Sequence, residues 1–281
     1  MRIQKSNGLG NDLAASKQKR HAVSTRIWHW VNAVMVIILL MSGFAIFNAH
    51  PRLYWGSYGA DPDPAWFEIT DADGAGLIRL GQMELTATGP LGMSTDSKGQ
   101  PVARAFPAWA TIPSGRSLST SRRWHLSAAW VFGIGTAIFT LLSLLNGHVK
   151  RELLPSSSEL GASHILHSIR EHLRFRSHRH PIDAPYNVLQ KVSYLLIAGL
   201  VIPTLILTGL TMSPWINAVV PGLLDLFGGR QSARSIHFIC AVLMTLFILI
   251  HLIMILRTGP IRQVWAMITG GSIPQKGDEN G

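Results

Sequence analysis

Four long stretches of the chain are dominated by apolar residues and contain no Asp, Glu, Lys or Arg. They are Ile27 to Phe47, Trp124 to Leu145, Val192 to Met212 and Ile236 to Leu256. Each has 21 or 22 residues, and a helix needs about 20 apolar residues to cross the roughly 30 Å hydrocarbon layer of a membrane. The pattern therefore predicts four transmembrane helices, and Pro203 predicts a kink in the third.

The polar segments between these stretches predict the organisation of an all-α membrane protein, a four-transmembrane-helix bundle. Its parts are an N-terminal segment 1–26, a four-helix domain 27–256 and a C-terminal tail 257–281. A loop of 76 residues, 48–123, joins the first two helices, and a loop 146–191 joins the second and third. Turn dipeptides such as Asp61-Pro62 and Gly89-Pro90 predict that the first loop is long and irregular, with room for one short hairpin.

The distribution of charge predicts the orientation in the membrane. Segments 1–26, 146–191 and 257–281 together carry 16 basic and 7 acidic residues, whereas 48–123 and 213–235 carry 9 and 8. By the positive-inside rule, both termini and loop 146–191 are cytoplasmic, and loop 48–123 is on the outer side of a bacterial inner membrane. Anionic lipid accounts for the net charge of +10, so we expect membrane lipid and no nucleic acid as a partner.

Composition excludes several function classes. With 47% hydrophobic and 14% charged residues, the chain is not a soluble enzyme. The one cysteine, Cys240, lies inside the fourth span, which excludes a disulfide, a Cys-ligated iron–sulfur cluster and covalent attachment of a c-type haem. The sequence also lacks a Gly-rich phosphate loop and a dinucleotide fingerprint.

Histidine is the informative residue type, because ionisable groups inside a membrane span are costly and usually functional. His237 and His251 lie 14 residues apart in the fourth span, on one helix face and about 21 Å apart along the axis. His29 starts the first span at the level of His251, and His125 starts the second at the level of His237. An antiparallel bundle can therefore form two pairs at two depths. The pairs are His29 with His251 on the cytoplasmic side and His125 with His237 on the outer side.

Two imidazoles at one depth match the axial ligands of a haem iron, and such ligation leaves no open iron position, which favours electron transfer. We therefore predict two non-covalent haem b groups. An Arg precedes three of the histidines by one helical turn, on the side of the water, where it can meet a haem propionate. These residues are Arg26, Arg122 and Arg234. Arg257 flanks His251 similarly, and Gly43 is expected to leave room for the porphyrin of the outer haem.

Other interpretations of these residues stay open. Helix-end Arg and Trp are ordinary membrane-interface anchors, and His29 or His125 taken singly is typical of a histidine among lipid headgroups. His148, at the inner end of the second span, competes with His29 as the partner of His251. A histidine-lined metal transporter is disfavoured, because its spans would need acidic residues to bind a cation and these have none.

Four motifs carry a resemblance to a known family. They are Arg26-x-x-His29-Trp30, Asn187-x-x-Gln190-Lys191, Leu207-Thr-Gly-Leu210 and His237-x13-His251. Over residues 20 to 270, the chain resembles the bacterial di-haem, cytochrome b561-like subunits of hydrogenases, formate dehydrogenases and, most closely, thiosulfate-reductase-type complexes. The resemblance implies two haem b groups, quinone exchange near the cytoplasmic haem and a partner redox subunit. It also places Asn187 and Gln190 at the quinone pocket, although both can equally be helix N-terminal caps.

We therefore expect a membrane electron-transfer subunit that connects the quinone pool to a partner subunit on the outer side. The partner would carry molybdopterin, an iron–sulfur cluster or a similar group, with Trp66-Phe67 as an apolar contact. The alternative is a stand-alone, quinone-linked haem oxidoreductase of the superoxide oxidase or metal reductase type. In the first case the chain is not itself the catalytic subunit.

Overall fold

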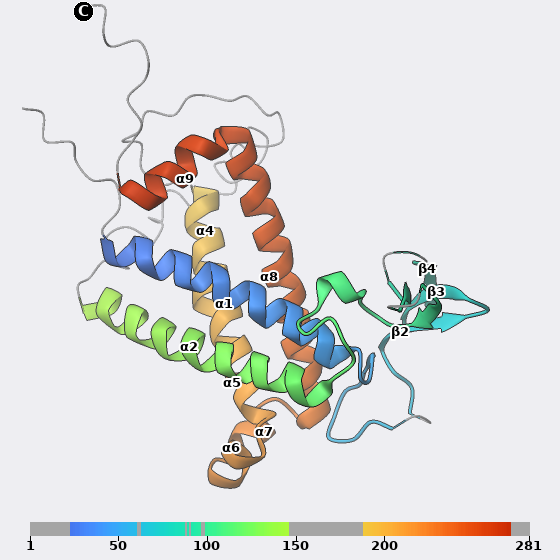
Figure 1. Ribbon diagram of the computed structural model, residues 1–281. Helices are drawn as coiled ribbons and strands as arrows, with labels where there is room; N and C mark the ends of the chain where they lie inside the picture. Colours follow the sequence, from blue (N-terminus) through green and yellow to red (C-terminus); the bar gives the residue numbers. More distant parts are fainter. Residues whose placement is uncertain are drawn as a thin grey trace, which may run out of the picture. The chain divides into compact units, whose positions relative to one another are not determined.

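The computed structural model describes residues 23–60, 63–87, 89, 91–96, 99–145 and 188–270. This part is mostly helical, and four of its helices are long and apolar enough to cross a membrane. They are Val23–Phe47, Leu118–Leu145, Lys191–Thr211 and Arg230–Thr258. The four predicted spans are thus confirmed, and the chain is a multi-pass membrane protein (Figure 1).

The chain divides into two compact units. The larger is Asn32–Leu249, and the smaller combines Met1–Val31 with Ile250–Gly281. Helices α1 (Val23–Phe47) and α8 (Arg230–Thr258) contribute residues to both units.

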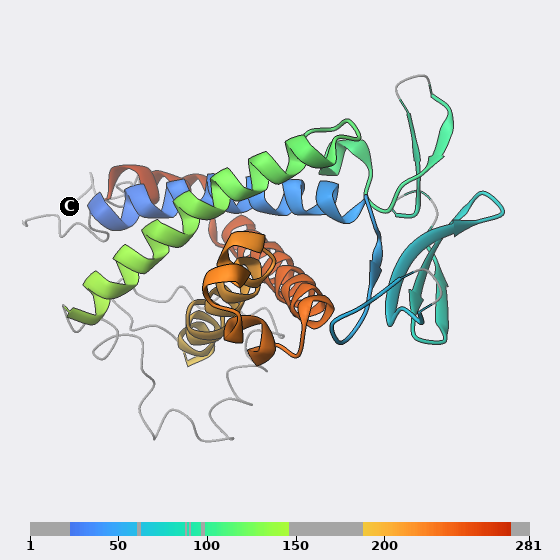
Figure 2. The ribbon, with the colours of Figure 1, turned by 90° about the horizontal axis from the view of Figure 1, so that it is seen from below.

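In the larger unit, α1 contacts both α2 (Leu118–Leu145) and α8, through Ser42 with His125 and through Phe47 with Phe238. Helix α1 lies beside α2, as both ribbon views show (Figures 1 and 2). The third span packs against α8 through a buried cluster of Ile197, Val201, Cys240 and Met244. Many other apolar side chains of these helices are exposed, among them Ile134, Ile138 and Leu141 of α2. Such a surface is costly in water and is suited to the hydrocarbon of a membrane.

The third span changes its helical geometry at mid-length. It consists of α4 (Val188–Leu196), the π-helical segment η3 (Ile197–Val201) and α5 (Ile202–Thr211). Pro203 lies in the first turn of α5; it has no N–H to donate, and its ring clashes with the carbonyl four residues earlier. That carbonyl belongs to Gly199 of η3, so the widened π-helical turn accommodates the proline.

The segment between α1 and α2 is more regular than we expected, and the description of 48–123 as an irregular loop needs correction. An antiparallel sheet contains β1 (Arg52–Leu53), β2 (Phe67–Ala72), β3 (Ala75–Leu80) and β4 (Met83–Thr86), in that order. A separate hairpin pairs β5 (Met93–Thr95) with β6 (Pro101–Ala103). A 3₁₀ turn, η1 (Ala108–Ala110), follows before α2.

Two tight turns explain this sheet. Strands β2 and β3 are joined by Asp73-Gly74, both with positive φ, 50° and 79°, the conformation that matches the twist of a two-residue hairpin. Strands β3 and β4 are joined at Gly81, whose φ is 59°. The short loops fix the register, and the sequence signal was the Asp-Gly dipeptide between two runs of apolar and β-branched residues.

We refer to β1 to β6 and η1 together as the sheet segment. This segment is attached to the start of α8. The Gly56 carbonyl accepts hydrogen bonds from the amides of Gln231 and Ser232, at 3.0 and 3.1 Å, and so satisfies two N–H groups of the first helical turn. The indole of Trp66 donates to the Ser235 hydroxyl at 2.9 Å. Short helices α6 (Pro214–Val219) and α7 (Gly222–Leu226) precede this helix start.

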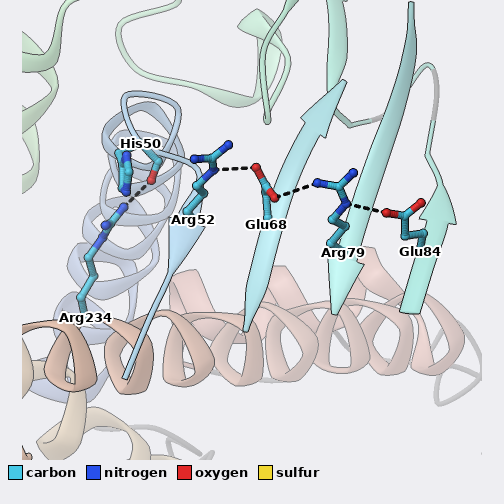
Figure 3. Close-up of polar contacts among 6 residues, drawn as sticks. All are labelled: His50, Arg52, Glu68, Arg79, Glu84 and Arg234. Atoms are coloured by element: carbon cyan, nitrogen blue, oxygen red, sulfur yellow. Dashed lines mark hydrogen bonds and ion pairs between the residues drawn. The ribbon is translucent and has the colours of Figure 1, made fainter. Parts of the chain in front are cut away.

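A row of alternating charges crosses the sheet (Figure 3). Glu68 of β2 is buried and accepts from Arg52 at 2.6 Å and from Arg79 at 3.4 Å. Arg79 also donates to Glu84 of β4 at 2.6 Å. The hydrogen bond and charge of Glu84, followed by the charge of Glu68, raise the pKa of Arg79 above its ordinary value. Each strand of the sheet thus contributes one member to an ion-pair network.

In the smaller unit, α9 (Pro260–Thr269) follows α8 after Gly259, whose positive φ of 98° allows the chain to turn. The Arg26 guanidinium donates to the carbonyl of Ile268 in the last turn of α9, where a cation is favoured by the helix dipole. A groove with mostly apolar walls runs beside these residues. It is lined by Val23, Arg26, Ile27, Trp30, Val31, Met267 and Ile268.

Candidate functional site

Two of the predicted histidines meet in the larger unit. His125 projects from the second turn of α2 and His237 from the second turn of α8. The centres of their imidazole rings are 6.2 Å apart. We refer to these residues as the 125/237 pair.

Each ring of the 125/237 pair has a hydroxyl beside its Nδ1 atom. The Ser42 hydroxyl of α1 lies 3.0 Å from His125 Nδ1, and the Leu39 carbonyl lies 3.1 Å from the same atom. The Thr208 hydroxyl of α5 lies 3.0 Å from His237 Nδ1. Both Ser42 and Thr208 are fully buried, at 0% exposure, so these contacts are shielded from water.

A glycine follows each of the two hydroxyl residues and lies against the same ring. A Cβ atom built on Gly43 would lie 3.5 Å from Cε1 of His125, and one on Gly209 would lie 3.5 Å from Cε1 of His237. The structure therefore places Gly43 against the His125 ring, and its expected role in leaving room for the porphyrin stays a prediction. Sequence reasoning missed Ser42, and it used Thr208 and Gly209 only as part of the Leu207-Thr-Gly-Leu210 motif, with no role at a histidine. The Ser-Gly and Thr-Gly dipeptides in two spans were the visible signal.

The other two histidines meet in the smaller unit. The ring centres of His29 on α1 and His251 on α8 are 6.5 Å apart. The edge of Trp30 also contacts His29, with ring centres at 5.3 Å. We refer to His29 and His251 as the 29/251 pair.

Both separations fit two imidazoles on opposite sides of one metal. With a metal–nitrogen bond of about 2.0 Å and about 1.1 Å from that nitrogen to the ring centre, the two ring centres lie about 6 Å apart. The observed 6.2 and 6.5 Å agree with this value. Each pair thus fits an axial ligand set for haem iron, and the assignment of these four residues as ligands stays a prediction.

The structure gives the predicted propionate partners different surroundings. Arg26 bonds the end of α9. Arg234 donates to the backbone carbonyl of His50, at the start of the sheet segment (Figure 3). Arg122 is exposed on α2. If Arg26 and Arg234 bind haem propionates, each would do so while also donating to a backbone carbonyl. Binding of a propionate stays a prediction for Arg26, Arg122 and Arg234.

Several other predicted residues lie at the limit of the described structure. Asn187 and His148 are outside the described residues, and Gln190 lies in α4 with its side chain outside the description. Trp66 and Phe67, our expected partner contact, pack against the buried cluster that contains Leu53 and Ile69 of the sheet. These two aromatic residues therefore stabilise the sheet segment, and the exposed aromatic side chains nearby are Trp55, Tyr58 and Trp109.

Comparison with known families agrees with the four membrane-spanning helices. The family model described as prokaryotic cytochrome b561 matches residues 20–270, which is most of the chain. The chain belongs to the prokaryotic cytochrome b561 family. Members bind b-type haem, so this chain is a membrane haem protein of the cytochrome b class, as the motifs had indicated.

The chain is also similar to a curated protein from Azospira oryzae named putative protein-methionine-sulfoxide reductase subunit YedZ1. The two are 24% identical over 253 residues, which cover 89% of this chain and 96% of the relative. No solved structure matches the chain.

Proposed function

We propose that this cytochrome b561-family protein is a di-haem subunit that transfers electrons between the quinone pool and a partner redox subunit. The observation that carries the proposal is the presence of two histidine pairs, each with the ring separation of a bis-imidazole ligand set. In this proposal, His125 and His237 hold one haem b, and His29 and His251 hold the other. Bound haem supplies a one-electron carrier, and ligation by two imidazoles leaves no iron position open for oxygen.

Quinone exchange is assigned to the side of the 29/251 pair, which we propose to be cytoplasmic. The groove in the smaller unit supports this assignment, because Arg26 and Trp30 line it from the same turns of α1 that carry His29. Its apolar walls suit a hydrophobic ring. Asn187 and Gln190 remain the proposed hydrogen-bond donors to the quinone.

A partner subunit is assigned to the outer side of a bacterial inner membrane, at the sheet segment. This segment is pinned to the first turns of α8, one helical turn from His237, and it exposes Trp55, Tyr58 and Trp109. Exposed aromatic residues are typical of contact surfaces. The relative from Azospira oryzae is named as a reductase subunit, which also supports a role within a complex.

The proposal is tested with the full chain purified from its own membranes, together with whatever subunits remain bound. A reduced quinone analogue should reduce the haem, and a second redox protein should co-purify. Haem that a quinol analogue cannot reduce would contradict the quinone assignment. Rapid quinol-driven reduction of a small acceptor by the pure chain, with no bound subunit, would instead support the stand-alone oxidoreductase.

A further inference from the structure

The hydrogen bonds around His125 determine which of its nitrogens carries the proton. The Ser42 hydroxyl donates its one hydrogen to the Ile38 carbonyl at 2.6 Å, so toward His125 it can only accept. The Leu39 carbonyl, 3.1 Å from the same Nδ1 atom, can also only accept. Both contacts are satisfied when Nδ1 bears the hydrogen, and neutral imidazole then has its free lone pair on Nε2.

His237 is held in the same way by a different helix. The Thr208 hydroxyl donates to the Thr204 carbonyl at 2.6 Å and lies 3.0 Å from His237 Nδ1, where it must accept. The Leu205 carbonyl also lies beside this ring. The proton of His237 is therefore also assigned to Nδ1.

The two supports form a short internal repeat. Leu39-x-x-Ser42-Gly43 on α1 matches Leu205-x-x-Thr208-Gly209 on α5, and the carbonyl, hydroxyl and glycine of each contact one histidine. The histidine that each contacts lies on the next long helix and follows an Arg by three residues, in Arg122-x-x-His125 and Arg234-x-x-His237. In the first occurrence of this pattern, the sheet segment lies between the helix that carries the hydroxyl, α1, and the helix that carries the histidine, α2. Because the same arrangement of hydroxyl and glycine occurs at both histidines, we infer that the site requires it.

We propose that Ser42 and Thr208 are positioning residues, which fix the Nδ1–H form and the ring orientation of His125 and His237 so that each Nε2 serves as a haem ligand. The inference rests on the proposed haem ligation by the 125/237 pair. Acceptors on the far nitrogen of a ligating imidazole orient the ring and raise its basicity. A more basic ligand favours oxidised iron, so these hydroxyls should lower the reduction potential of the haem at this pair.

The test compares Ser42→Ala, Thr208→Val and the double variant with the parent protein in detergent or nanodiscs. We expect the haem at the 125/237 pair to bind about tenfold more weakly in the double variant, the low end for loss of such outer contacts. Its reduction potential should move to a more positive value, while the haem at the 29/251 pair keeps its potential. Thr208→Ser, which retains the hydroxyl, should restore the parent potential.

Two matched controls separate this role from a purely structural one. Thr245 bonds the Ala241 carbonyl at 2.8 Å in α8, and Ser121 bonds the Ser117 carbonyl at 2.8 Å in α2. Each repeats the hydroxyl-to-carbonyl bond of Thr208 and Ser42 toward the residue four positions earlier. Thr245→Val and Ser121→Ala should leave both haem potentials unchanged.

The outcomes distinguish failure of the inference from failure of the proposed function. Unchanged affinity and potential in the double variant, or equal shifts in the control variants, would overturn the role of Ser42 and Thr208. His125→Ala serves as the reference, because it should remove this haem outright. If His125→Ala leaves both haems in place, the ligand assignment itself fails, whatever the hydroxyl variants show.

Discussion

The two histidine pairs have nearly the same ring separation, 6.2 Å for the 125/237 pair and 6.5 Å for the 29/251 pair, in different surroundings. The first lies between buried hydroxyls on α1 and α5. At the second, His29 contacts Trp30, which also lines an apolar groove. One ring spacing is thus obtained with two kinds of support. The polar support suits histidine rings that are held in one orientation and one tautomer, and the groove suits a site that a small apolar molecule can approach.

The largest expected effect is the loss of one haem at a time. His125→Ala should remove the haem of the 125/237 pair and His29→Ala the haem of the 29/251 pair, so each variant should keep about half of the haem. Haem content and the difference spectrum of each purified variant measure this. His50→Ala is the control, because it removes a ring that stacks on Tyr54 and preserves the carbonyl bonded by Arg234.

This comparison also tests the pairing. If His29→Ala keeps both haems and His148→Ala loses one, then His148 is the partner of His251 and the proposed 29/251 pair is wrong.

The next effect should appear only on the quinone side. Asn187→Ala or Gln190→Ala should preserve both haem spectra but slow reduction by a quinol analogue, by an amount corresponding to about 1 to 3 kcal/mol for an unmet polar group. If these residues are helix caps, the loss should instead be about 1 kcal/mol of stability with unchanged electron uptake. Stopped-flow reduction, measured beside thermal unfolding, distinguishes the two, and normal kinetics in the double variant would exclude the site.

A smaller effect is expected at the sheet segment. Glu68→Gln removes a buried charge that accepts from Arg52 and Arg79 and should cost about 1 to 2 kcal/mol of stability. Thermal unfolding followed by tryptophan fluorescence measures this. Glu84→Gln is the control and should cost less, because its ion pair with Arg79 is exposed. An equal loss of stability in both variants would mean that the burial of Glu68 contributes nothing to stability. Neither substitution should alter the haem at the 29/251 pair.

The smallest effect is expected at the glycines. In Gly43→Ala or Gly209→Ala the new methyl group would lie 3.5 Å from a histidine ring, an ordinary contact, so haem content should stay unchanged and stability should change by less than about 1 kcal/mol. Gly209→Leu should displace the His237 ring and lose the haem. Spectra of the three variants check this, and full haem content in Gly209→Leu would show that the ring does not need this space.

How much could be predicted from sequence depended on whether the signal was local. The four spans and the pairing of the histidines could be predicted from charge-free runs and helical periodicity, which each helix carries alone. The pairing of β1 with β2 and the contact of Arg26 with the end of α9 join residues distant in sequence, and no local pattern predicts them. The Asp73-Gly74 turn was a local signal for a β-hairpin, and it was a better guide to this segment than the turn-rich composition around it.

The hydroxyl contacts of Ser42 and Thr208 depend on the rotation and register of one helix against another. A residue pattern can show that a serine or threonine precedes a glycine in two spans. Only the packed helices show that both hydroxyls meet a histidine Nδ1.

The most direct test of the central claim is a count of haem per chain combined with its ligand state. We predict two haems per purified chain, both extracted by acid–acetone, and a low-spin electron paramagnetic resonance signal of bis-histidine iron from each. Loss of one signal in His125→Ala and of the other in His29→Ala assigns them to the two pairs. A chain with no haem, a single haem that both variants abolish, or a pigment that resists extraction would contradict the account.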